Sequence, residues 1–163
     1  MKIYKVGGAV RDRLLSFQYH ETDWVVIGSS PEEMINLGFT PVGRDFPVFL
    51  HPKTSEEYAL ARTEIKTGVG HKDFIFETNK NISLEDDLKR RDFTINSIAF
   101  EVSAKKIYDL YGGISDIKSK KLNLLHSKSI SDDPSRLIRC AKYASRLDFN
   151  ISNNSLKQSQ ETV

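Results

Sequence analysis

The stretch Gly7-Gly8-Ala9-Val10-Arg11-Asp12 decides the fold, because it joins a short apolar run at residues 3–6 to a helical pattern that runs through Leu15. Glycines between a strand and a helix let a phosphate approach the backbone closely, and the first turn of the helix offers free N–H groups. Gly8 and Arg11 are therefore candidate phosphate ligands. A plain tight turn with a surface arginine is the alternative. The spacing matches neither a dinucleotide fingerprint nor a Walker P-loop.

Two carboxylates precede the next apolar run, which is predicted to be a buried strand at residues 24–27. Glu21 and Asp23 are two positions apart, so on a strand they point to the same face. Neighbouring carboxylates repel each other unless a cation lies between them, and Mg²⁺ prefers one or two carboxylates together with substrate phosphates. Glu57, on a later strand, is a candidate third ligand. An ordinary acidic strand end remains the alternative interpretation.

A third group of polar residues ends a helix that is predicted over residues 83–90. Arg90 and Arg91 suit a triphosphate, because a guanidinium group is always charged and binds phosphate in a bidentate manner. Asp92 and Asn96 are candidate ligands of a ribose. A solvated helix end, whose basic residues complement the helix dipole, is an equally good interpretation of this segment alone.

The fourth group opens a predicted helix that runs to about residue 147. At about 100° per residue, Asp132, Arg136 and Arg139 share one face of this helix, and Asp133 lies beside them. An aspartate and an arginine together present the acceptor and donors that recognition of the Watson–Crick edge of a base requires. The alternative is an ion pair that only stabilises the helix.

Composition limits the class of protein. The chain has 163 residues, of which 39% are hydrophobic and 28% charged, so it can bury a core. Its single cysteine, Cys140, excludes an intramolecular disulfide. No apolar run approaches the roughly 18 residues of a membrane span, and the N-terminus does not resemble a signal peptide. We expect a cytoplasmic α/β protein. Residues 101–163 carry 11 Lys and Arg against 7 Asp and Glu, which favours an anionic partner.

Hydrophobic patterning and turn residues predict the remaining elements. Strands are expected at residues 39–42, 47–50, 57–62, 107–111 and 121–125, and a capped helix at 31–38. Residues 66–81 are polar and predict a mobile loop. Residues 95–102 fit a helix or a strand equally well. The tail, residues 150–163, has no strong apolar face and is expected to be frayed or to belong to something larger.

In their order along the chain, these segments resemble the motifs of one family. That family is the class II bacterial tRNA nucleotidyltransferases, the CCA-adding enzymes of the polymerase β-like superfamily. The resemblance runs from Met1 to about Phe149. It is carried by residues 2–12, 23–28, 43–52, 90–96, 109–116 and 133–139.

The resemblance implies both an architecture and an activity. It implies an α/β (α+β) head with a mixed sheet and flanking helices over residues 1–125, followed by the start of a helical neck at 126–163. The activity would be template-independent addition of CCA to tRNA 3′ ends from CTP and ATP, with Mg²⁺ as cofactor. The tRNA 3′-hydroxyl would attack the α-phosphate and release pyrophosphate. The loop at 66–81 resembles the one needed for the switch from C to A addition.

The resemblance also implies roles for single residues. Gly8 and Arg11 would hold phosphates, Glu21 and Asp23 would bind Mg²⁺, and Arg91 would contact the incoming nucleotide. Base selection would fall to three residues, namely Asp133, Arg136 and, in support, Arg139.

The chain departs from the family pattern at two positions and in length. Glu21 and Asp132 stand where the family has Asp and Glu. Family members continue into helical body and tail regions that grip tRNA, so a truncated protein or a separate C-terminal partner chain is expected. A poly(A) polymerase of the same superfamily, and a nucleotide- or RNA-binding remnant with little activity, are the alternative functions.

Overall fold

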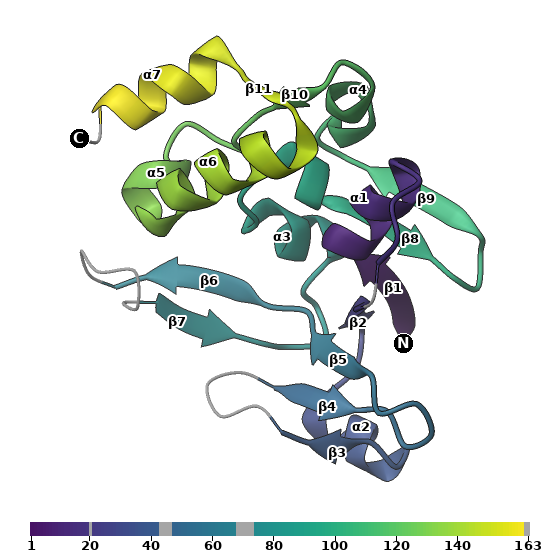
Figure 1. Ribbon diagram of the computed structural model, residues 1–163. Coiled ribbons are helices and arrows are strands. Elements are labelled where there is room, and N and C mark those ends of the chain that lie inside the picture. The colour runs from purple at the N-terminus through teal and green to yellow at the C-terminus, as the bar shows by residue number, and fades with distance from the viewer. Residues whose placement is uncertain (20, 43–46, 68–73, 162–163) are drawn as a thin grey trace.

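A mixed seven-stranded sheet forms the centre of the computed structural model, which describes residues 1–19, 21–42, 47–67 and 74–161 (Figure 1). Its strand order is β3-β4-β5-β2-β1-β8-β9. Only the β2–β5 pair is parallel within this sheet, and its other neighbours are antiparallel. The strands are β1 (Lys2–Val6), β2 (Asp23–Ile27), β3 (Thr40–Pro41), β4 (Val48–Leu50), β5 (Glu57–Leu60), β8 (Ile98–Glu101) and β9 (Lys106–Asp109). The expected mixed sheet is confirmed.

Helices cover this sheet, and two of them begin as the sequence predicts. Ser30 and Ser83 each form a capping box with the acidic residue three positions later, which satisfies free N–H groups of the first turn. The helices are α1 (Gly8–Leu14), α2 (Pro31–Asn36), α3 (Leu84–Lys89), the 3-10 helix η1 (Thr94–Asn96), α4 (Gly113–Lys118), α5 (Ser129–Asp132), α6 (Ser135–Leu147) and α7 (Asn153–Glu161).

Alternation along the strands distributes the apolar side chains over both faces of the sheet. Val25 of β2 packs in one buried cluster with Leu88 of α3, whereas its neighbour Val26 packs in another with Met34 of α2. Each of these four side chains is at most 2% exposed. The two faces of the sheet are therefore covered by different helices. Asp23 is the first residue of β2, which lies between these two layers.

A third apolar cluster attaches α6 to the rest of the molecule. It contains Val10 of α1, Ile98 of β8 and Ile117 of α4, together with Cys140 and Leu147 of α6. Burial raises the pKa of the Cys140 thiol and keeps it neutral at pH 7. Helix α6 is thus held at a fixed position above α1. The division into head and neck at residue 125 stays a prediction.

Two segments differ from the expectation. Within the predicted loop at 66–81, Phe74–Glu77 forms β7, which pairs antiparallel with β6 (Thr63–Lys66), while residues 68–73 lie outside the described part of the chain. The expected frayed tail is also wrong: β11 (Asn150–Ile151) pairs in parallel with β10 (Lys121–Leu122), and α7 follows it. In both places a short segment is ordered by a partner strand, which local patterning does not reveal.

The undecided segment at 95–102 becomes η1 and then β8, whose side chains pack on both faces of the sheet. Part of the motif at 43–52, residues 43–46, lies outside the described residues. None of the helices in the described ranges is long and apolar enough to cross a membrane.

Candidate functional site

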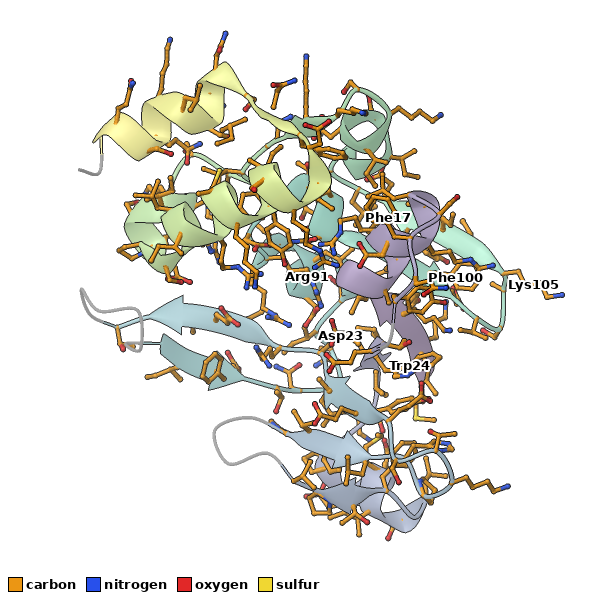
Figure 2. All side chains as sticks on the ribbon, viewed as in Figure 1. Phe17, Asp23, Trp24, Arg91, Phe100 and Lys105 are labelled. Atoms are coloured by element: carbon orange, nitrogen blue, oxygen red, sulfur yellow. The ribbon has the colours of Figure 1, made fainter. Side chains whose placement is uncertain are left out.

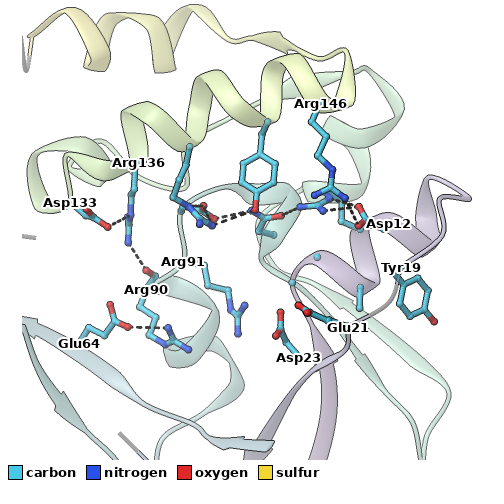
Figure 3. Close-up of a pocket in the computed structure, with 18 of the residues that line it drawn as sticks. Asp12, Tyr19, Glu21, Asp23, Glu64, Arg90, Arg91, Asp133, Arg136 and Arg146 are labelled. Carbon is cyan, nitrogen blue, oxygen red and sulfur yellow. Dashed lines mark hydrogen bonds and ion pairs between the residues drawn. The ribbon is translucent and has the colours of Figure 1, made fainter. Parts of the chain in front are cut away.

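A cavity of about 620 Å³ opens between α6 and the strands below it (Figure 3). Ten of the predicted site residues line it, namely Gly8, Arg11, Glu21, Asp23, Arg91, Asp92, Asn96, Asp133, Arg136 and Arg139. Glu57 does not line it. The segments that carry these residues are far apart in the sequence, so the fold itself gathers them.

Gly7 brings two of these groups close together. Its backbone φ of +67° is one that residues other than glycine rarely adopt. A Cβ atom built on Gly7 would lie 3.2 Å from Arg91 Nη1 and 3.5 Å from Asp23 Oδ2. The turn before α1 therefore needs glycine both for its backbone and for the room that it leaves to a guanidinium group and a carboxylate.

The candidate metal ligands are Glu21 and Asp23. Both are exposed toward the cavity, and in the described part of the chain neither carboxylate forms a hydrogen bond or an ion pair with another side chain. Two carboxylates and open space for phosphate oxygens and water are the set that Mg²⁺ prefers, so the residues present fit this ion.

The structure does not bring Glu57 into that set. It is exposed at the start of β5, the strand that pairs with β2. The described residues contain no group of three or more His, Cys, Asp or Glu side chains arranged to hold a metal ion. The candidate metal ligands are therefore the pair of Glu21 and Asp23 alone.

Arg91 points to the same space from the end of α3, opposite Asp23 (Figure 2). Its Nη2 donates to Asp87 Oδ2 at 3.1 Å, and Arg90 donates to Asp87 Oδ1. Burial acts to raise the pKa of Asp87, but the two guanidinium groups outweigh it and hold the pKa below its usual range. Asp87 is fully buried, so it fixes both arginines. The Nε of Arg91 is buried without a partner among the described residues.

Arg11 differs from the expectation of a phosphate ligand. It is 2% exposed, and its guanidinium group is held inside the protein. Its Nε donates to Asp12 Oδ1 at 2.7 Å, and its Nη1 donates to Asn96 Oδ1 at 2.6 Å. The ring of Tyr143 lies 5.0 Å from the guanidinium carbon. Because its donors are engaged by these partners, Arg11 supports the wall of the cavity.

Asp92 and Asn96, expected to bind ribose, are likewise used internally. Asn96 Nδ2 donates to Asp92 Oδ1 at 3.0 Å, and Arg139 Nε donates to Asp92 Oδ2 at 2.7 Å. Burial acts to lower the pKa of Arg139, but Asp92 outweighs it and raises that pKa. At the other end, Arg146 Nη2 donates to Asp12 Oδ2 at 3.3 Å.

These contacts form one continuous chain that links α6 to α1 and to the segment from residue 92 to η1, and we call it the interface network. Its members are Arg146, Asp12, Arg11, Asn96, Asp92 and Arg139. Sequence reasoning missed Asp12, Arg146 and Tyr143. A signal was available, because Arg139, Tyr143 and Arg146 are spaced i, i+4 and i+7 and therefore share one helix face.

Arg136 lies apart from the interface network. It is 8% exposed, and its Nη2 donates to the carbonyl oxygen of Arg90 at 2.8 Å. Its Nη1 is buried and has no hydrogen-bond partner in the part of the chain that the structure describes. Asp133 lies 3.8 Å away and also accepts from the N–H and hydroxyl of Ser135. An unpaired buried donor is costly, and Arg136 also lines the cavity, so its guanidinium group lies beside any ligand bound there.

The chain belongs to the poly A polymerase head domain family, whose model matches residues 3–123. It is 51% identical over 159 residues to the Multifunctional CCA protein of Acinetobacter baylyi, covering 96% of this chain and 38% of that protein. The Multifunctional CCA protein of Acidovorax sp. is 47% identical over 167 residues, covering 100% and 39%. The chain thus spans about two fifths of the length of these curated relatives.

Solved structures show the same arrangement. The apo form II of a CCA-adding enzyme superimposes with a TM-score of 0.79 at 27% identity, covering 99% of this chain and 40% of that one. A tRNA nucleotidyltransferase complexed with a primer tRNA and an incoming ATP analog superimposes with a TM-score of 0.76 at 32% identity, covering 98% and 46%.

Proposed function

We propose that this protein is a CCA-adding tRNA nucleotidyltransferase, which extends tRNA 3′ ends from CTP and ATP. The observation that carries the proposal is one cavity in which the carboxylates of Glu21 and Asp23 face the guanidinium group of Arg91. Such a cavity can hold a triphosphate and a divalent cation together. The relatives named CCA proteins support the choice of reaction.

Glu21 and Asp23 would hold Mg²⁺, which supplies charge neutralisation at the phosphates and a more acidic attacking hydroxyl when bound. Arg91 would bind the triphosphate, because its permanently charged guanidinium group lines the cavity close to Asp23. The backbone at Gly8 would allow a phosphate to approach closely. Arg11 acts through the wall of the cavity, where it holds Asn96.

The base of the incoming nucleotide would lie against α6. Arg136 offers a donor at Nη1 and Asp133 a carboxylate acceptor, and the contact of Arg136 with the Arg90 carbonyl fixes the guanidinium group. In the reaction, the 3′-oxygen of the primer forms a bond to the α-phosphorus and loses its proton. The bond from that phosphorus to the β-phosphate breaks, and pyrophosphate leaves.

The partners follow from this reaction. The substrates would be CTP, ATP and the 3′ end of tRNA, and the place of action the cytoplasm. The curated relatives are longer than this chain, which supports the proposal that additional C-terminal sequence or a separate partner chain contributes to tRNA binding. Without such surface, the chain would bind tRNA through a few cations only. This binding would be weak and salt-dependent, with a dissociation constant of about 10⁻⁴–10⁻⁶ M.

Incorporation of labelled CTP and ATP into a tRNA that lacks its 3′ end tests the proposal, with Mg²⁺ and with EDTA. We expect Mg²⁺-dependent addition of C and then A. Addition of A without any need for CTP would indicate a poly(A) polymerase instead. Nucleotide binding without any transfer would indicate a remnant.

A further inference from the structure

A groove in the surface adjoins the cavity at Tyr19. This groove, of about 280 Å³, shares Ala9 and Tyr19 with the cavity. Figure 3 shows Tyr19 beside Glu21 and Asp23, on the side away from Arg91 and Arg136. The groove therefore begins next to the candidate metal ligands and leads away from the candidate triphosphate ligands.

The sheet forms the floor of the groove. Lys5 of β1 pairs with Phe100 of β8, and Phe100 pairs with Ile107 of β9, so the three side chains stand in one row on one face. The same row continues beyond the groove to Trp24 of β2, which lies under the Lys5 ammonium group at 4.9 Å. The floor of the groove is thus formed by Phe100, Ile107 and the stem of Lys5, and the groove meets the cavity at Ala9 and Tyr19.

Positive charge lies above this floor. The guanidinium carbon of Arg13, on α1, is 5.6 Å from the centre of the Phe100 ring. Arg13 is exposed, and its side chain forms no hydrogen bond or ion pair with the residues that the structure describes. Aromatic faces for bases together with cations for phosphates are the features that bind single-stranded nucleic acid.

The geometry of the reaction indicates which strand this is. In an in-line displacement, the attacking oxygen and the leaving oxygen are on opposite sides of the phosphorus atom. If the triphosphate lies toward Arg91, the attacking 3′-hydroxyl approaches the carboxylates from the Tyr19 side. The nucleotide that precedes this hydroxyl then lies over the groove.

We propose that the groove is the subsite for the RNA primer nucleotide that precedes the attacking 3′ terminus. Its base lies against the aromatic side chains of Phe100 and Tyr19, and its phosphate contacts Arg13 and Lys5. This inference rests on the proposed function for the direction of approach, and the site itself can be tested without any transfer reaction.

The test is a binding titration of a short single-stranded oligoribonucleotide, labelled at its 5′ end, into the chain at low salt, monitored by fluorescence anisotropy. Arg13→Glu should weaken binding by about tenfold and reduce the salt dependence. Phe100→Leu keeps an apolar side chain in the core but removes the aromatic face, and it should weaken binding by about fivefold or more. Lys53→Glu is the charge-matched control, on the exposed turn between β4 and β5.

MgCTP binding, measured by calorimetry in the same proteins, separates the two proposals. Unchanged MgCTP affinity with weakened RNA binding in Arg13→Glu and Phe100→Leu supports the subsite. If both variants bind RNA as Lys53→Glu does, or if the unmodified chain binds no RNA, the subsite is overturned. If the unmodified chain fails to bind MgCTP but shows the expected RNA effects, the proposed function fails and the RNA site stands.

Discussion

The cavity holds two pairs of arginines that are used differently. Arg11 of α1 and Arg139 of α6 belong to the interface network and are engaged by acidic or amide side chains. Arg91, after α3, and Arg136 of α6 line the cavity outside that network, and each keeps one nitrogen without a partner among the described residues. The arginines of the network fix the position of α6, whereas the other pair is left to bind a ligand through its charged groups.

The largest effect is expected at the carboxylates. Asp23→Ala should lower CMP and AMP incorporation by about 10³-fold or more, because it removes one of two metal ligands. The free energy of unfolding should stay the same or rise slightly, since repulsion from Glu21 disappears. Nucleotide transfer by Asp23→Ala at the rate of the unmodified protein would show that Asp23 is not a required metal ligand.

Substitution within the interface network should instead lower the stability of the fold. Asp12→Ala leaves the fully buried Arg11 without its carboxylate partner and should lower the free energy of unfolding by about 3 kcal/mol. Urea denaturation measures this value. Lys80→Ala breaks an exposed ion pair with Glu33 and is the control, with a much smaller expected loss because solvent screens this pair. Equal losses in the two variants would show that the network does not hold the fold together.

Base choice should depend on Arg136 more than on any residue of the interface network. Arg136→Ala should reduce the preference for CTP and ATP over UTP and GTP by about tenfold or more, because a wrong base no longer leaves polar groups unpaired. Competition binding with the four nucleotides measures the preference. A uniform loss of affinity for all four would make Arg136 a phosphate ligand.

A smaller effect concerns acid stability. The pKa of Asp87 is lowered in the folded protein by Arg90 and Arg91, against the effect of burial. Its contribution to stability is therefore complete above about pH 4 and is lost as the pH falls through the lower, folded-state pKa. Between pH 5 and pH 2, the free energy of unfolding should fall more steeply in the unmodified protein than in Asp87→Asn. Parallel curves of unfolding free energy against pH for the two proteins would show that Asp87 does not contribute to acid stability.

The sequence predicted well those features that depend on neighbours along the chain. The capped helices after Ser30 and Ser83, and α6, follow from local patterning. The β6–β7 and β10–β11 pairs do not, because their strands have only two to four residues and each is ordered by its partner strand.

The same distinction applies to the site. Residue types and spacing indicated Arg11 and Arg91 equally well as phosphate ligands. Only the fold shows that Asn96, 85 positions away, engages Arg11, whereas Arg91 keeps a free donor. Which arginine binds a ligand depends on three-dimensional partners that no local pattern contains.

The most direct test of this distinction is calorimetric titration of MgCTP into Arg91→Ala and Arg146→Ala. Arg91→Ala should lose affinity by about tenfold or more, because a charge-assisted contact with the triphosphate disappears. Arg146→Ala loses only a contact with Asp12 and should bind MgCTP as the unmodified protein does while it remains folded. An equal loss of affinity in both variants, or none in Arg91→Ala, would contradict the division of the cavity arginines into structural and ligand-binding residues.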